Sequence, residues 1–257
     1  MRCIDPRGLC ACLLLASLIP AAAWCDEPPA QGVWTGKGQV GFVASQGNTE
    51  ARSANAAIDM ALLEDPWKHA LHLGGLYGQS ANVTSAERWD ALWQSNYDFS
   101  KKFFTFGALR YAHDLFSGFQ YQESVSAGLG YKVIDTDDVK LAAQLGVGYR
   151  KERPEELIKD ASGAVIARIL ENSTGEAILS AGLDYSQALT KTTTLSNKLL
   201  IESGSSNTLL SDALALAVKM STRLALSVGY MVQNNSSPPA GLKKLDSTET
   251  INLVFSF

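Results

Sequence analysis

From residue 33 onward, apolar and polar side chains alternate along most of the chain. Between 139 and 150 the odd positions are Val, Leu, Ala, Leu, Val and Tyr, while the even positions are Lys, Ala, Gln, Gly, Gly and Arg. The segments 88–99, 124–133 and 223–233 show the same pattern. Successive side chains of a β-strand point to opposite faces, so this period of two predicts strands with one apolar and one polar face.

Segments of about ten alternating residues, separated by turn residues, are typical of a transmembrane β-barrel. We therefore expect an all-β fold, an antiparallel up-and-down barrel of about twelve transmembrane strands. Phe103, Phe104 and Phe106 interrupt the alternation, so the phase of one strand stays open. A helical spacing of apolar residues is an alternative to the strand alternation only between Pro154 and Leu170. The expected strands span 33–45, 50–63, 67–80, 86–99, 103–114, 119–133, 139–151, 172–188, 192–203, 208–219, 222–234 and 246–257.

A soluble β-sandwich or a ligand-binding barrel would also show alternation. The expected strands are longer than the five or six residues that are usual in soluble sheets. Aromatic residues lie near the ends of the apolar faces, where a membrane barrel carries its interfacial girdles. Examples are Trp89, Tyr149, Tyr185 and Tyr230. These features favour the transmembrane barrel over the soluble alternatives.

The last expected strand ends in an aromatic residue. Ile251, Leu253, Phe255 and Phe257 share one face, and Phe257 is the final residue. Such a strand resembles the signal that the outer-membrane barrel-assembly machinery reads, so we expect Phe257 and Phe255 to form an assembly signal. The alternative is an ordinary amphipathic edge strand.

The N-terminal segment has the parts of a secretory signal peptide. Arg2 and Arg7 precede an apolar run from Leu9 to Ala23, which ends in three alanines. This run is shorter than the ~20 apolar residues that cross a bilayer as a helix. We expect a protein of the bacterial outer membrane with a cleaved signal peptide (1–23), a short periplasmic segment (24–32) and a barrel (33–257). The alternative is a retained N-terminal anchor helix.

Charge and cysteine content restrict the chemistry. The formal net charge is −4, and the charged residues within 1–23 sum to +1, so the cleaved chain carries −5. Electrostatic attraction to nucleic acid is therefore not expected. Cys25 is the one cysteine outside the signal peptide, which excludes an internal disulfide and a cysteine metal site. A lipidated bacterial cysteine follows a small residue, whereas Trp24 precedes Cys25.

The connections between the expected strands alternate in length. In bacterial barrels the turns on the periplasmic side are short, and both chain ends lie on that side when the strand number is even. Tight connections occur at every second position: 64–66, 100–102, 134–138, 189–191 and 220–221. The two longest connections, 152–171 and 235–245, belong to the other set, which we assign to the cell exterior. In that set, 46–49 is expected to be an exceptional tight turn, because Gly and Asn there supply positive φ.

Several short motifs together resemble one family. They are Ser45-Gln-Gly-Asn-Thr49, Trp67-Lys-His69, the stretch Leu109-Arg-Tyr-Ala-His-Asp-Leu-Phe-Ser-Gly118, and Ala127-Gly-Leu-Gly-Tyr131. The chain resembles the YdiY-like family, described as salt-induced outer-membrane proteins, over most of residues 33–257. This resemblance implies an outer-membrane barrel. It brings no settled activity and no catalytic residues.

Enzymatic barrels need a base paired with a nucleophile or an acid, and His is the usual base. His69 shares the parity of the apolar face and should face lipid, whereas His72 should face the lumen. His113 and Asp114 are adjacent on a strand, so they point to opposite faces and form a poor dyad. We expect no catalytic residues and no enzymatic activity.

Metal and phosphate binding have weak support. The acidic run Glu152, Glu155 and Glu156 could bind a divalent cation, but its spacing fits no known loop, and a solvated charged loop is the better interpretation. The serines at 203, 205, 206 and 211 have ordinary turn composition. We expect no metal site and no cofactor.

The polar faces of the expected strands carry charges that a barrel must point inward, since Lys or Arg at the lipid midplane costs ~2–4 kcal/mol. Glycines on this face, such as Gly128, Gly130 and Gly146, are expected to leave space beside the charges. The lumen-facing candidates are Lys37, Asp59, His72, Arg88, Asp90, Asp98, Arg110, Lys132, Lys140, Arg150, Glu176, Asp184, Lys198, Glu202, Lys219 and Arg223.

Three functional hypotheses follow from these residues. The first is a narrow, non-enzymatic passage for small polar solutes or ions. In the second, the same charges pair and close a structural or receptor-like barrel. The third is a lipid-modifying enzyme that uses His72 or His113. The expected partners are outer-membrane lipid, lipopolysaccharide and the barrel-assembly machinery, without nucleic acid.

Cleavage after Ala23 is directly testable. The protein extracted from membranes should begin at Trp24, because three alanines precede that residue. Intact-mass measurement reads this N-terminus. A mass that includes residues 1–23, or a lipid adduct on Cys25, contradicts the prediction.

Overall fold

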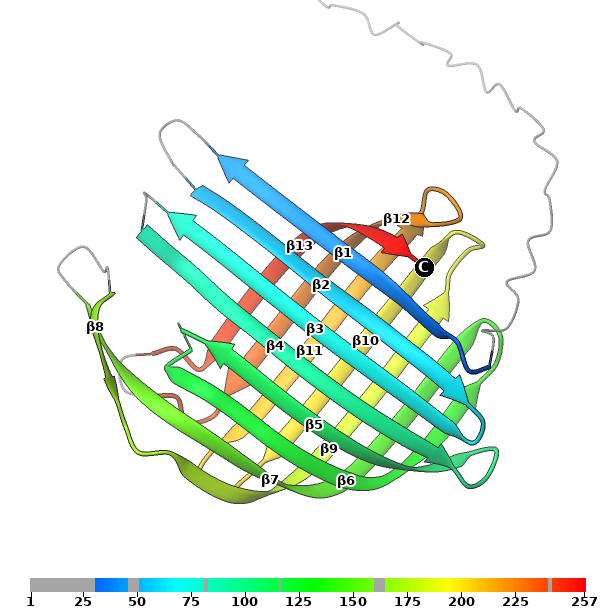
Figure 1. Ribbon diagram of the computed structural model, residues 1–257, viewed down its shortest axis with the longest axis horizontal. Helices are drawn as coiled ribbons and strands as arrows, with labels where there is room; N and C mark the ends of the chain where they lie inside the picture. The colour runs from blue at the N-terminus through cyan, green and yellow to red at the C-terminus, as the bar shows by residue number, and fades with distance from the viewer. Residues whose placement is uncertain (1–30, 46–50, 81–82, 116, 160–164, 240–241) are drawn as a thin grey trace, which may run out of the picture.

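The computed structural model describes residues 31–45, 51–80, 83–115, 117–159, 165–239 and 242–257. No helix in these segments is long and apolar enough to cross a membrane. The strands, drawn in Figure 1, are β1 (Trp34–Ser45), β2 (Ala51–Glu64), β3 (Trp67–Ser80), β4 (Val83–Asp98), β5 (Phe103–Asp114), β6 (Phe119–Asp135), β7 (Val139–Lys159), β8 (Val165–Leu170), β9 (Thr174–Ala188), β10 (Thr193–Ser203), β11 (Thr208–Lys219), β12 (Leu224–Asn235) and β13 (Leu245–Ser256).

Twelve strands, β1–β7 and β9–β13, form a closed antiparallel barrel. Each strand pairs with its neighbours, and β1 closes the barrel by pairing with β13, with Lys37 opposite Ser256 and Val40 opposite Leu253. Phe257 continues this seam by exchanging two backbone hydrogen bonds with Gly36. This seam joins the first and last strands, as a lipid-facing sheet requires.

The barrel has two distinct ends (Figure 1). The end that we call the turn end carries Phe257 and the short connections such as Asp65-Pro66 and 136–138. The opposite end, the loop end, carries the connection from β7 to β9 and the segment 236–244. The expected alternation of short connections is therefore present. The loop end also has a short connection at 204–207, between β10 and β11.

The two faces of the wall differ as the alternation predicted. Outward side chains are apolar and exposed, as Phe42 (71% exposed), Leu145 (57%) and Val147 (69%) illustrate. Aromatic residues cluster near both ends of the outer face, with ring centroids of Trp67 and Tyr97 5.0 Å apart at the turn end. At the loop end Trp89 stacks on Tyr111 at 4.8 Å. This arrangement confirms a transmembrane β-barrel.

The predicted strands agree with the observed ones, with one clear error. The segment 152–171 was expected to be a long exterior connection, but β7 continues to Lys159 and pairs with β8, which lies outside the barrel closure. Glu155, buried in this hairpin, forms an ion pair with Arg168 at 2.5 Å. Such a contact between strands gives no periodic signal along the chain. The expectations for 1–23, for 24–30 of the periplasmic segment and for 46–49 concern residues outside the described segments.

Two buried phenylalanine rings show which residues of β5 face the lumen. Phe104 and Phe106 are each 4% exposed and point into the lumen, while Phe103 and Leu109 point outward. Phe104 lies opposite Gly130 and Phe106 lies opposite Gly128. A Cβ atom added to Gly130 would overlap the Phe104 ring. The expectation that these glycines leave open space is therefore wrong, because the two phenylalanine rings fill it.

This packing predicts opposite effects of valine at two glycines. Gly130→Val should displace the Phe104 ring and destabilise the barrel by about 1–3 kcal/mol, the usual cost of overpacking. Gly38→Val should be tolerated, because an added Cβ there meets open space on the outer face. Urea titration of the refolded barrels in detergent, followed by heat-dependent gel mobility, compares them. Equal stability of both variants would contradict the packing described.

Candidate functional site

The barrel interior is the candidate site, because most of the candidate charged residues project into it. Residues directly opposite each other on paired strands share a face, and the registers place Lys37 opposite Asp59, Asp59 opposite His72, and Lys198 opposite Asp184. Lys219 is the last residue of β11, and Arg223 lies in the turn before β12, so these two lie at the rim of the turn end.

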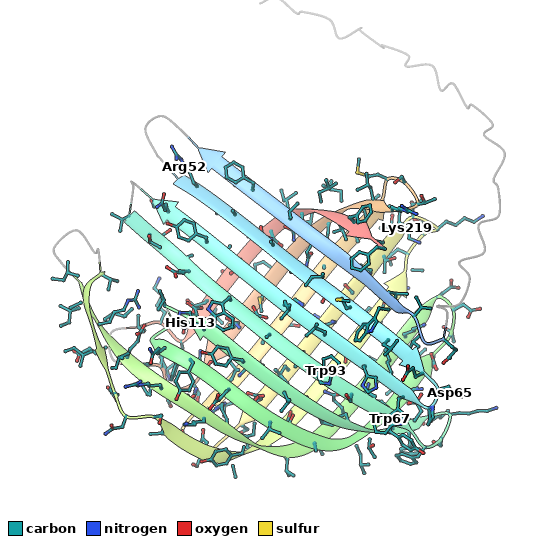
Figure 2. All side chains as sticks on the ribbon, viewed as in Figure 1. Arg52, Asp65, Trp67, Trp93, His113 and Lys219 are labelled. Carbon is teal, nitrogen blue, oxygen red and sulfur yellow. The ribbon has the colours of Figure 1, made fainter. Side chains whose placement is uncertain are left out.

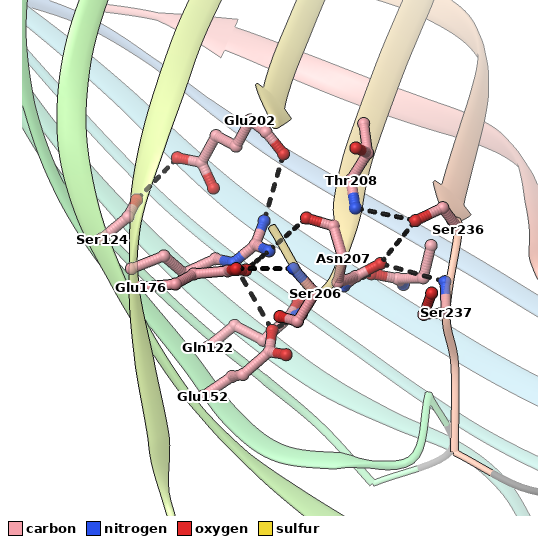
Figure 3. Close-up of polar contacts among 12 residues, drawn as sticks. Gln122, Ser124, Glu152, Glu176, Glu202, Ser206, Asn207, Thr208, Ser236 and Ser237 are labelled. Atoms are coloured by element: carbon pink, nitrogen blue, oxygen red, sulfur yellow. Dashed lines mark hydrogen bonds and ion pairs between the residues drawn. The ribbon is translucent and has the colours of Figure 1, made fainter. Parts of the chain in front are cut away.

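A buried ionic network occupies the loop half of the lumen, on the wall formed by β5–β7, β9 and β10. Its centre is Arg150 of β7, whose side chain is 0% exposed. One terminal nitrogen, Nη2, donates to a Glu176 carboxylate oxygen and to the Asn207 carbonyl, both at 2.6 Å. The other, Nη1, donates to the Glu202 carbonyl at 3.2 Å (Figure 3). One guanidinium thus joins β7, β9 and the β10–β11 connection.

Glu202 of β10 extends this network across the lumen. Its carboxylate accepts hydrogen bonds from Arg110 of β5 at 3.0 Å and from Ser124 of β6 at 2.6 Å. Its side chain is 3% exposed. Because β5 and β10 are not neighbours in the wall, the Arg110–Glu202 ion pair crosses part of the lumen. Burying such charges is tolerable because each has several hydrogen-bond partners.

The connection 204–207 folds inward and takes part in the network (Figure 3). The Ser205 hydroxyl and the Ser206 amide donate to Glu176 at 2.9 and 2.8 Å. Asn207 is 2% exposed and donates to Asn235 at 3.1 Å. The sequence indicated only an ordinary turn here. Much of the contribution comes from backbone groups, which have no signature in the sequence.

A second polar cluster lies on the opposite wall. His72 contacts Asp59 through Nδ1 at 2.7 Å and Asp90 through Nε2 at 3.2 Å. Arg88 lies 3.7 Å from Asp90 and donates to Gln233 at 2.8 Å, so it reaches across the lumen from β4 to β12. Both ring nitrogens of His72 are engaged by carboxylates. This is an ion-pair cluster, not the base–hydroxyl pair of a hydrolase.

The other two histidines face outward. The His69 ring lies between Trp67 and Trp93, with ring centroids 5.8 Å away on each side, and its Nδ1 is 2.8 Å from the Ser95 hydroxyl. His113 lies against Trp89 and near the Gln120 carbonyl. Figure 2 shows Trp67 and Trp93 toward the turn end and His113 toward the loop end. These histidines belong to the interfacial aromatic belts.

The turn half of the lumen is lined by what we call the lysine cluster: Lys68, Lys132, Lys140 and Lys198. Lys132 pairs with Asp98 at 2.5 Å. Lys68 interacts electrostatically with the other three lysines and with Asp184. Apart from the half-buried Lys132, these lysines are exposed, although they point inward, so water reaches them. Lys68 was missing from the sequence-based candidates, although it shares the parity of His72.

The acidic run of the loop end does not converge on one point. Glu152 accepts from Gln122 at 3.1 Å and lies 3.5 Å from Arg150 Nε, whereas Glu155 pairs with Arg168. Within the described segments, no group of three or more His, Cys, Asp or Glu residues is arranged to hold a metal ion.

A closed antiparallel wall, apolar outside and charged inside, defines a transmembrane β-barrel protein whose lumen is partly crossed by side chains. Within this class, the chain belongs to the family described as protein of unknown function, DUF481, whose model matches residues 38–257. The chain is 23% identical over 243 residues to the uncharacterized protein YdiY of Escherichia coli (strain K12), covering 90% of this chain and 86% of that protein. The YdiY-like resemblance is thereby confirmed.

Solved structures with similar architecture include two porins and one translocator domain. The NanC porin has a TM-score of 0.46 at 11% identity, over 88% of this chain and 99% of that one. The KdgM porin has a TM-score of 0.42 at 13% identity, over 88% and 99%. The translocator domain of the autotransporter NalP from Neisseria meningitidis has a TM-score of 0.45 at 16% identity, over 90% of both chains.

The buried network predicts a strong effect of removing Glu202. Glu202→Leu leaves Arg110 buried without its carboxylate, which should destabilise the barrel by about 3–5 kcal/mol. Combining it with Arg110→Met should recover much of this loss, because neither charge then remains unpaired. Urea unfolding of the single and double variants forms the test. A Glu202→Leu protein as stable as the original would show that the pair is not a buried ion pair.

Proposed function

We propose that the barrel is a narrow, non-enzymatic passage for small polar solutes or ions in the bacterial outer membrane. The observation that carries this proposal is the contrast between the two halves of the lumen. The lysine cluster is water-accessible, whereas the network around Arg150 narrows the loop half. A water-accessible, lysine-lined half and a polar, buried network in the other half suit small hydrophilic solutes.

The charge of the turn half supports a preference for anions. The lysine cluster contributes four positive charges, and Asp98 and Asp184 offset two of them. Lysine side chains in water keep mobile, hydrated ammonium groups, which attract anions without holding them tightly. We propose that the passage admits small anions more readily than cations.

The proposed orientation follows the rule that short turns face the periplasm. The lysine cluster then lines a periplasmic entrance, and the Arg150 network lies toward the cell exterior. Outer-membrane lipid and lipopolysaccharide are the proposed surroundings of the apolar outer face. The barrel-assembly machinery is the proposed reader of Phe255 and Phe257, whose exposed rings (44% and 54%) share that face.

A closed, receptor-like barrel is the second candidate, and the burial of Arg150 favours it. In that case the network is a plug, and its removal should harm folding without opening a route for ions. A lipid-modifying enzyme ranks third, because His72 lies between two carboxylates. The nearest approach to a base–hydroxyl pair, His69 with Ser95, is covered on both ring faces by tryptophans.

Conductance across planar bilayers distinguishes these candidates. The purified barrel should give small, salt-dependent conductance steps. The double variant Arg110→Ser with Glu202→Ser should enlarge the conductance steps. It removes the ion pair that crosses the lumen and leaves neither of its two charges without a partner. Glu249→Ser is the matched control, since Glu249 lies opposite Tyr230 on the outer face.

If well-folded protein gives no conductance across a range of voltages and salt concentrations, the proposed passage is refuted. Release of fatty acid from phospholipid or lipopolysaccharide, lost in His72→Ala, His113→Ala or Ser95→Ala, would support the enzyme instead.

A further inference from the structure

Among the described residues, the outer face of the barrel carries a hydrogen-bonded amide–carboxylate pair on β10 and β11. Asn197 of β10 donates through Nδ2 to Asp212 Oδ1 of β11 at 2.6 Å. Asn197 lies opposite Tyr185 and Leu214, and Leu214 lies opposite Tyr230, so the whole row faces outward. The pair is therefore on the membrane side of the wall.

This pair lies well inside its two strands. Asn197 is the fifth residue of β10, which has 11 residues, and Asp212 is the fifth of β11, which has 12. Leu195, Leu199 and Leu214 are its outward neighbours. A carboxylate in such an apolar band is costly unless it is paired, and ionisable groups inside a membrane usually have a functional partner.

The hydrogen bond between Asn197 and Asp212 leaves one oxygen of each side chain available for a further hydrogen bond. Among the described residues, the Asp212 Oδ2 and Asn197 Oδ1 atoms have no hydrogen-bond partner. Lipid tails cannot provide one. An amide beside a carboxylate is self-complementary, because each copy offers donors and acceptors to an identical pair.

The surrounding surface also differs from the rest of the outer face. The strands β10 and β11 contain no Trp, Tyr or Phe. By contrast, β3, β4 and β5 carry Trp67, Trp89, Trp93 and Tyr111, and these rings make aromatic contacts at both ends of the barrel. Aromatic residues anchor lipid-facing walls at the interfaces. A wall with aliphatic residues and a central polar pair is thus better suited to protein than to lipid.

We propose that the outer face of β10 and β11 packs against the same face of a second copy of this chain. A two-fold axis through the interface brings the two Asn197–Asp212 pairs together, so that the amide of each copy donates to the carboxylate of the other. Leucine side chains around the pair fill the rest of the contact. This interface is independent of whether the lumen conducts.

Site-specific photocrosslinking in cells tests the interface. A benzoylphenylalanine residue at position 214, in place of Leu214, should give a crosslinked product of twice the chain mass. The same probe in place of Leu145 on β7, which is also outward and exposed, should not. Equal dimer yield from both positions, adducts to lipid alone at 214, or a crosslink to a different protein would each overturn the proposal.

A matched pair of variants tests the role of the polar pair. Asn197→Leu combined with Asp212→Leu makes the face fully apolar and should weaken dimerisation about tenfold, the scale of one polar contact between membrane segments. Glu249→Leu, an acidic residue on another part of the outer face, should leave dimerisation unchanged. Native mass spectrometry in detergent gives the dimer fraction, and heat-dependent gel mobility shows that each barrel is folded. An undiminished dimer in the double variant contradicts the proposal.

Discussion

The need to satisfy every backbone hydrogen bond inside a bilayer is the constraint on which this structure depends. A lipid-facing sheet cannot leave an edge, so the first and last strands must pair. Here β1 and β13 pair over Lys37–Val40, and Phe257 extends the seam to Gly36. Closure then fixes the two faces, because the period of two sends every second side chain into the lumen. The charged residues are inside for this reason.

Once the charges are inside, their burial differs between the two halves. Arginine and glutamate form the loop-half network, where the guanidinium of Arg150 holds three acceptors at once. The planar, multidentate guanidinium suits such a buried role. Lysines occupy the turn half, where water remains in contact with them. This division, and not the total charge of the chain, distinguishes the two halves of the lumen.

The sequence predicted the features that depend on local periodicity. Strand positions, the inward parity of Arg110 or Arg150, and the outward parity of His69 all follow from alternation. Contacts across the lumen could not be predicted, because Arg110 meets Glu202 and Arg88 meets Gln233 over large separations in sequence. The β7–β8 hairpin and the inward fold of 204–207 were missed, since neither has a periodic pattern. Phe104 and Phe106 were ambiguous because three phenylalanines within four positions obscured the phase.

We propose that the turn half of the lumen selects small anions for a narrow passage. The reversal potential of the purified barrel in a potassium chloride gradient tests this claim most directly. If the lysine cluster selects anions, the reversal potential should be shifted toward the equilibrium potential of chloride. This shift should become smaller when Lys68, Lys140 and Lys198 are replaced together by serine. A reversal potential shifted toward the equilibrium potential of potassium, or one that the triple replacement leaves unchanged, would contradict the proposed anion preference.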